Sequence, residues 1–156
     1  MIGGLRIVAW TNDVGLNVPL RTRLALALEL IDRYGPRLGA RLRHDVKGIV
    51  CYPAGGTNFK VSSRTITLDI RWSMIGTIED LALTLVHEAT HARCRALGVR
   101  YRGKQHRSEE LALRQEIAFA DLLDPGYARP PSEVLGLPKA PFRALRRVTR
   151  FLRGGR

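Results

Sequence analysis

The sequence predicts an α+β fold: one small domain in which a short antiparallel or mixed sheet packs on two consecutive helices. Residues 64–72 alternate polar and apolar side chains with a period of two, as a half-buried strand does. Residues 77–97 and 108–123 instead repeat apolar positions at the three- and four-residue spacing of an amphipathic helix. A chain of 156 residues is long enough to bury one core.

The first third of the chain is predicted to hold two strands around one helix. Residues 2–10 form a first strand in this prediction, and residues 46–52 form a second, short one. Between them, residues 18–38 carry a leucine-rich helical pattern that ends near Gly35-Pro36. Residues 53–58, which include a proline and two glycines, are predicted to turn the chain.

The alternating segment 64–72 is the most clearly patterned strand. We expect one of its faces to be buried and the other to be polar. The expected buried face holds Ile66, Leu68, Ile70 and Trp72, and the opposite face holds Thr65, Thr67, Asp69 and Arg71. Gly76 is predicted to end this region.

Two helices are predicted next. Thr77 is an N-cap residue, with an acid, Asp80, three positions later, and Gly98 follows the expected last turn. The second helix covers about residues 108–123 and is stopped by Asp124-Pro125-Gly126. We therefore divide the chain into a domain over 1–138 and a C-terminal tail over 139–156.

The tail is predicted to be a basic amphipathic helix. Its apolar residues recur every three or four positions, and arginines fill most of the rest. Such a helix can lie on an anionic membrane, contact nucleic-acid phosphates, or dock on the domain; simple disorder is a further alternative. The apolar positions are Phe142, Leu145, Val148 and Leu152.

The net charge of +12 admits a nucleic-acid partner without requiring one. Of the 26 basic residues 22 are arginine, and such a bias also arises from a GC-rich genome. Two cysteines are too few for a disulfide scaffold, no apolar stretch approaches the roughly 18 residues of a membrane span, and the N-terminus lacks a signal-peptide pattern. The expected location is the cytoplasm, with peripheral membrane contact as an alternative.

The segment His87-Glu88-Ala89-Thr90-His91 contains the residue types of a metal-binding catalytic site. Residues four apart lie on one face of a helix, so the two imidazoles can hold one tetrahedral Zn²⁺ at about 2.0–2.1 Å. Glu88 projects about 100° away and is free to take a proton from water. The apolar residues of this helix gather on the side opposite the histidines, which we therefore expect to face solvent or a cleft.

The third metal ligand is expected on the next helix. Glu109 and Glu116 fall near the centre of its apolar face, whereas Glu110 falls on the polar face. A carboxylate that faces inward needs a partner, and this favours Glu109 as the ligand. Glu116 is the main rival and can equally accept a proton from a ligand histidine; His106 is a third candidate. Cys94 shares the side of His91, but a buried structural role suits it better.

These residues resemble the zincin metallopeptidases, in a minimal gluzincin-like form, over about residues 65–123. Glu109-Glu110-Leu111-Ala112 matches the Glu-x-x-Ala pattern that carries the third ligand in that form. The metzincin form fits less well, because Cys94 and Leu97 stand where it needs a glycine and a histidine. The wider pattern is also similar to small bacterial proteins of unassigned function. The resemblance implies that an extended peptide substrate pairs with the strand before the helix, here 64–72.

The sequence thus favours a zinc-dependent hydrolase, namely a metallopeptidase that cleaves peptide bonds with Glu88 as general base and His87, His91 and Glu109 as metal ligands. The expected partner is a peptide or protein substrate. The alternative is a zinc-bound domain without turnover that binds nucleic acid or another partner through its arginine-rich surface. Composition and motif leave the oligomeric state open.

Overall fold

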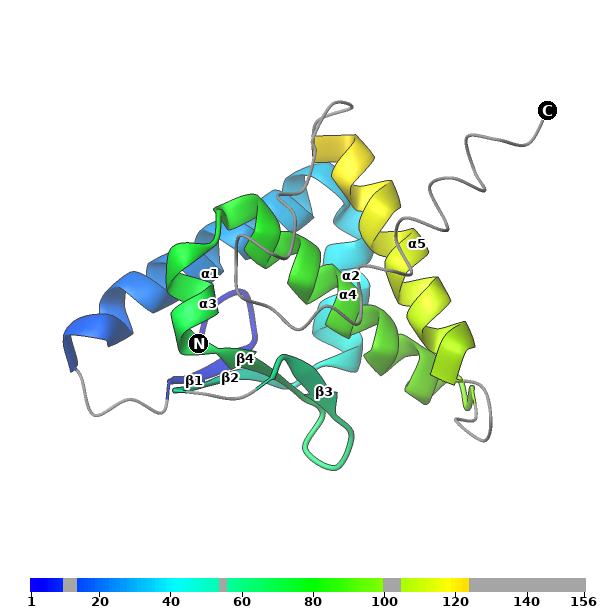
Figure 1. Cartoon of the computed structure of the whole chain (residues 1–156), viewed down its shortest axis with the longest axis horizontal. Coiled ribbons are helices and arrows are strands. Elements are labelled where there is room, and N and C mark those ends of the chain that lie inside the picture. Colours follow the sequence, from blue (N-terminus) through cyan, green and yellow to red (C-terminus); the bar gives the residue numbers. More distant parts are fainter. Residues whose placement is uncertain (10–13, 54–55, 100–104, 124–156) are drawn as a thin grey trace.

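The fold consists of a mixed β-sheet with helices packed against one of its faces (Figure 1). A computed structural model describes residues 1–9, 14–53, 56–99 and 105–123. The predicted tail over 139–156, and the predicted helix stop at 124–126, lie outside these ranges. The elements are β1 (Arg6–Ala9), α1 (Val14–Tyr34), α2 (Pro36–Asp45), β2 (Gly48–Tyr52), β3 (Asn58–Lys60), β4 (Thr65–Asp69), α3 (Ile70–Ile75), α4 (Ile78–Ala96) and α5 (Gln105–Leu123).

The described strands lie in the order β1-β2-β4-β3, with β3 the only antiparallel one among them. The register aligns Ile7 with Ile49 and Ile49 with Ile66, so a row of buried isoleucines crosses the three parallel strands. Cys51 and Leu68 form the next row of the same face. This apolar face is the one that the helices cover, and the α+β prediction with a mixed sheet is confirmed.

The connection between β1 and β2 contains two helices where the sequence predicted one. Parallel neighbouring strands need a crossover that returns the chain to the same end of the sheet, and α1 and α2 provide it. α1 ends at Tyr34, Gly35 is the N-cap of α2, and Pro36 opens α2 at a position where a missing N–H is harmless. The predicted break at Gly35-Pro36 is correct, but the pattern beyond it is a new helix.

The predicted strand over 64–72 is too long. β4 ends at Asp69, whose side chain accepts a hydrogen bond from the backbone N–H of Trp72 at 3.1 Å and so starts α3. The Ser73 hydroxyl donates to the Asp69 carbonyl and supports the same turn. Ile70 and Trp72 are buried as expected, but from a helix, because the N-cap at Asp69 overrides the alternating pattern.

Local signals at both ends define α4 as predicted. Thr77 and Asp80 form a reciprocal capping box at the N-terminus. At the C-terminus, Gly98 has φ of +68°, and the N–H groups of Gly98 and Val99 donate to the carbonyls of Arg95 and Cys94. This is a Schellman arrangement, in which a left-handed glycine satisfies the last carbonyls of the helix.

α4 is more deeply enclosed than its sequence pattern predicted. It packs against α1, α2 and α5 and lies over β3 and β4, so its N-terminal half is buried on almost every side (Figure 1). Asp80, Thr84 and His91, which were expected on an open side, are each at most 9% exposed. Leu97, expected on the apolar side, is 63% exposed at the helix end. Of the two expected surroundings of the histidines, solvent or a cleft, the low exposure of His91 excludes solvent for that residue.

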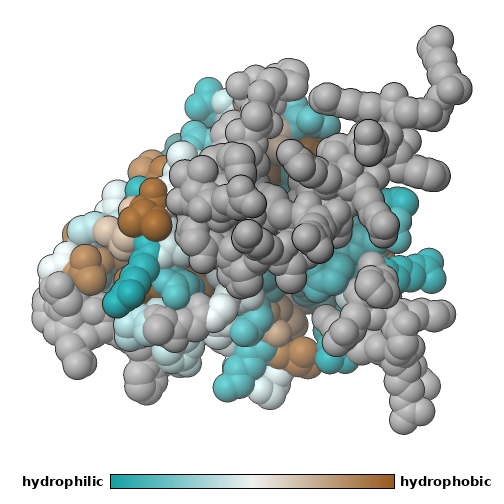
Figure 2. Space-filling view, viewed as in Figure 1, coloured by the Kyte–Doolittle hydropathy of each residue, from teal (hydrophilic) through white to brown (hydrophobic). Residues whose placement is uncertain are grey.

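The described surface is polar with scattered apolar side chains. Figure 2 shows hydrophobic residues reaching one face near α3 and near β3, in small groups separated by hydrophilic ones. Ile75 on α3 and Val61 after β3 are among the exposed apolar residues. No helix in the described ranges carries an apolar stretch long enough to cross a membrane.

Candidate metal centre

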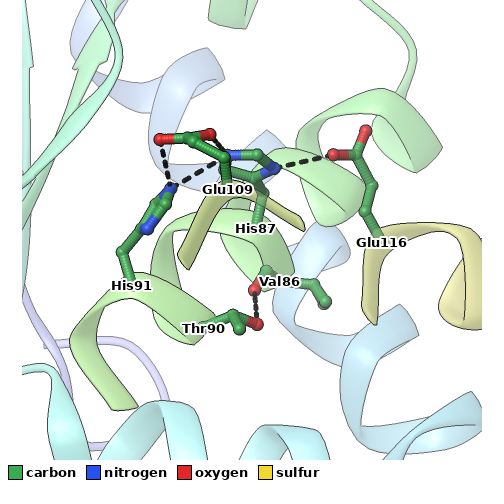
Figure 3. Close-up of polar contacts among 6 residues, drawn as sticks. All are labelled: Val86, His87, Thr90, His91, Glu109 and Glu116. Atoms are coloured by element: carbon green, nitrogen blue, oxygen red, sulfur yellow. Dashed lines mark hydrogen bonds and ion pairs between the residues drawn. The ribbon is translucent and has the colours of Figure 1, made fainter. Parts of the chain in front are cut away.

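The candidate centre lies between α4 and α5, which pack along each other (Figure 1). α4 supplies His87 and His91, one turn apart on the side that faces α5. α5 supplies Glu109 from its N-terminal part and Glu116 from two turns further on. In Figure 3 the two imidazoles and the Glu109 carboxylate point toward one another.

The three predicted ligands come together at a common point. The two imidazole Nε2 atoms are 3.1 Å apart. Glu109 places one carboxylate oxygen 3.4 Å from His91 Nε2 and the other 3.5 Å from His87 Nε2. Among the described residues, these three form a group of side chains whose ligand atoms are close enough to share one metal ion.

These separations fit a tetrahedral zinc site. Ligand atoms at 2.0–2.1 Å from one ion, with tetrahedral angles between them, lie about 3.3–3.4 Å from each other. The separation of the two imidazole nitrogens, 3.1 Å, is close to that value, and each nitrogen lies 3.4 or 3.5 Å from a different oxygen of Glu109. With one oxygen counted for Glu109, the three ligand atoms lie within 4.8 Å of one another, so small side-chain shifts bring them around one ion. Two imidazoles and a carboxylate are also a donor set that zinc enzymes use, with the fourth position left open.

Glu116 contacts the His87 ring at Nδ1, the nitrogen that does not face the other two candidate ligands. Its carboxylate oxygen Oε2 lies 2.9 Å from His87 Nδ1, and its side chain is only 8% exposed. A carboxylate accepts, so His87 Nδ1 carries a proton in this contact, and Nε2 is the nitrogen whose lone pair would face the centre once it loses its own proton to bind a metal. His91 Nδ1 is buried and has no hydrogen-bond partner within the described residues. Of the two candidate ligand histidines, His87 is thus the one whose Nδ1 meets a carboxylate within the described residues.

Glu109 reaches the histidines from the surface. Its side chain is 60% exposed, so the prediction that it faces inward along a buried stripe is wrong in detail, although the contact it makes is the predicted one. Hydrogen bonds from His87 and then His91 hold the pKa of Glu109 well below its usual range. The carboxylate is therefore ionised, as a metal ligand must be.

Glu88 lies on a different side of α4, beneath the sheet edge. It is 6% exposed, and this burial raises the pKa of its carboxyl group, while the charges of His87 and His91 act in the opposite direction. The backbone N–H of Phe59 on β3 lies near enough to Glu88 to act in that opposite direction too, lowering the pKa. The carboxylate is thus held between the edge strand and the histidines, and it is not one of the three grouped ligands.

The other residues considered as metal ligands lie in different places relative to the three-residue group. Glu116 contacts His87 from outside the three-ligand group, which matches the supporting role that the sequence left open for it. Cys94 is buried and does not join that group within the described part of the chain. The backbone of His106 belongs to α5, but its side chain lies outside the described residues. Glu110 lies on the exposed face of α5, as predicted, and pairs with Arg114 there.

The strand expected to pair with a peptide is not available for pairing. Both edges of β4 are occupied, by β2 in parallel register and by β3 in antiparallel register. The outer strand next to α4 is β3, which the sequence assigned in part to a turn. Its three residues are too few for a period-two pattern to be recognised, so sequence reasoning missed both β3 and the contact of Phe59 with Glu88.

Comparison with known proteins gives no match: no protein-family model, no curated protein and no solved structure is significantly similar to this chain.

Proposed function

We propose that this protein is a zinc-dependent hydrolase, and specifically a metallopeptidase of minimal zincin-like form. The observation that carries the proposal is the convergence of His87, His91 and Glu109, whose ligand atoms lie within 4.8 Å of one another. The resemblance of residues 87–91 to the zincin motif supports peptide-bond hydrolysis as the reaction. Three protein ligands leave the fourth position of a tetrahedral ion open, which is the arrangement of catalytic rather than structural zinc.

The chemistry of the donor set supports zinc over the hard cations. Ca²⁺ and Mg²⁺ prefer oxygen ligands, whereas two imidazole nitrogens with one carboxylate suit zinc and its first-row neighbours. When bound, the ion acts as a Lewis acid that polarises a substrate carbonyl and makes water acidic. The contribution of the chain is to hold the ligands in place, and Glu116 does this for His87 by fixing its tautomer.

Glu88 is the proposed general base. Its burial raises the pKa of its carboxyl group, so the carboxylate takes up a proton from water more readily than an exposed one. In peptide hydrolysis it accepts that proton and then delivers it to the nitrogen of the leaving amine. Glu88 adjoins His87 in the sequence and interacts electrostatically with both histidines, so it lies beside the proposed reaction centre.

The proposed substrate is an extended peptide that runs along β3. In zincins the peptide pairs with the strand at the edge of the sheet beside the active-site helix, and among the described strands β3 is the edge strand that contacts α4. The contact of the Phe59 backbone N–H with Glu88 brings this edge next to the proposed base. This assignment replaces the earlier expectation that the segment 64–72 receives the substrate.

A comparison of wild type with Glu88→Gln tests the proposed function. The variant keeps the shape and hydrogen-bonding capacity of the side chain but removes the base. We expect it to bind zinc as wild type does. Its rate of hydrolysis of a broad library of quenched fluorescent peptides should be at least about a hundredfold lower than that of wild type. Glu110→Gln, which changes an exposed acid on α5, is the matched control and should retain activity.

The alternative is a zinc-bound domain that binds nucleic acid without turnover, and the net charge of +12 favours it. The same proteins separate the two functions. Equal inactivity of wild type and Glu88→Gln, together with nucleic-acid binding that weakens steeply with salt, would reject the peptidase and support the alternative.

A further inference from the structure

A second candidate site lies on a different side of α4, where α2, α4 and α5 enclose a cavity of about 50 Å³. We call it the α2–α4–α5 pocket. Its floor is apolar and consists of Leu38 and Leu42 from α2 with Val86 and Ala89 from α4. The pocket shares no residue with the metal centre, although Gln115 on its wall adjoins Glu116 on α5.

The polar groups of the pocket are two arginines and an amide. Arg41 comes from α2, Arg93 from α4 and Gln115 from α5, so each helix contributes one side chain with N–H donors to the lining. The Thr90 hydroxyl, which also lines the pocket, donates to the Val86 carbonyl at 2.8 Å. Within the described part of the chain, the side chains of Arg41 and Gln115 have no hydrogen-bond or ion-pair partner, and their donors are free for a ligand.

The charge of the pocket fits a ligand with a single negative charge. Arg93 lies 3.7 Å from the carboxylate of Asp45, whose side chain is 1% exposed and also contacts His44. This buried acid offsets one of the two guanidinium charges, and one net positive charge remains. A guanidinium binds a carboxylate through two parallel hydrogen bonds, and Arg41 has all its donors available for that purpose.

We propose that the α2–α4–α5 pocket binds a small organic carboxylate that carries a short branched apolar group. The carboxylate pairs with Arg41 and Arg93 and accepts a hydrogen bond from the Gln115 amide. The apolar group enters the floor formed by Leu42, Val86 and Ala89. A cavity of about 50 Å³ accommodates a few methyl or methylene groups, which excludes long acyl chains from the floor. The same chemistry occurs in free short-chain acids and at the C-terminal leucine or valine of a peptide.

Binding of isovalerate to the full-length protein, followed by NMR, tests the proposal. We expect isovalerate to shift the resonances of Val86 and Ala89, and its neutral amide, isovaleramide, to leave them unchanged. Arg41→Gln should raise the dissociation constant about tenfold, because a charge-assisted hydrogen-bond pair is lost. Arg71→Gln removes the same charge from an exposed position on α3 and should change the constant less than about twofold.

A second variant tests the cavity itself. Ala89→Leu fills the floor while leaving both arginines in place, and it should abolish isovalerate binding with no change in zinc content. A peptide ending in a free leucine carboxylate identifies the source of the ligand: tighter binding than isovalerate assigns a peptide C-terminus, and weaker binding assigns a free acid.

Three results would each overturn the proposal. The first is equal binding of isovalerate and isovaleramide. The second is an effect of Arg71→Gln as large as that of Arg41→Gln. The third is unchanged binding in Ala89→Leu. None of them bears on the metal centre, whose residues are untouched by these variants.

Discussion

At the scale of single residues, the contact between His87 and Glu116 orients the imidazole ring of His87 in the candidate centre. Glu116 is buried and 2.9 Å from His87 Nδ1, whereas Glu109 approaches from solvent. The two acids of α5 therefore have different proposed roles, although they lie on the same helical face, seven positions apart. In the proposed centre Glu109 supplies a ligand atom, and Glu116 fixes the ring that supplies another.

Glu116→Gln should weaken zinc binding by about 10- to 100-fold, because the neutral amide no longer stabilises the proton on Nδ1 of a ligand histidine. Competition with a chromophoric zinc chelator measures the effect. Glu110→Gln, on the exposed face of the same helix, is the control and should leave the affinity within about twofold of wild type. Equal affinities for Glu116→Gln and wild type would refute the positioning role.

Cys51 yields a prediction about alkaline pH. The residue is fully buried in the sheet, and burial raises the pKa of its thiol from 9.0 to about 12. The neutral form is therefore favoured in the folded state. As the pH rises above 9, only the unfolded chain loses the proton, and the free energy of unfolding falls until the pH exceeds the folded pKa.

Between pH 8 and 10, wild type should lose about 1.4 kcal/mol more of its free energy of unfolding than Cys51→Ala. Urea denaturation of both proteins at the two pH values gives this difference. Val50→Ala removes a side chain that does not titrate from the same strand, and it should follow the wild-type pH dependence. A pH dependence of Cys51→Ala identical to that of wild type would show that the thiol ionises freely in the fold.

At the scale of elements, α4 is the part of the structure whose limits were most fully predictable. A capping box at Thr77 and Asp80 and a left-handed Gly98 are local signals, and local signals can be read from a single sequence. The limits of β4 and the presence of β3 and α2 were not predictable in this way. Asp69 caps α3 within an alternating pattern, and β3 is recognisable only through its pairing with β4.

The capping box supports a helix that carries three of the four residues proposed for metal binding and catalysis. Thr77→Ala should lower the free energy of unfolding by about 1 kcal/mol, because the side-chain acceptor for the Asp80 backbone N–H is lost. Thr22→Ala, at an exposed position inside α1, should change it by less than about 0.5 kcal/mol. Chemical denaturation compares the two variants, and equal losses would contradict a specific role for the cap.

At the scale of the whole molecule, the candidate centre lies where α4, α5 and the sheet edge meet. The sequence predicted His87, Glu88 and His91 because their spacing within one helix determines their relative directions. The third ligand was less predictable, since helical periodicity alone cannot rank Glu109 against Glu116. Their burial, 60% and 8% exposed, depends on how α5 packs on α4. Tertiary packing of this kind also creates the α2–α4–α5 pocket, which no sequence pattern indicated.

The central claim is that His87, His91 and Glu109 together hold one metal ion. Equilibrium dialysis against zinc, followed by elemental analysis, tests it most directly. We expect one zinc ion per chain in wild type, in Glu88→Gln and in Glu110→Gln, and much weaker binding in His87→Ala, His91→Ala and Glu109→Gln. Absence of zinc from wild type, or wild-type affinity in the Glu109→Gln variant, would contradict the three-ligand centre.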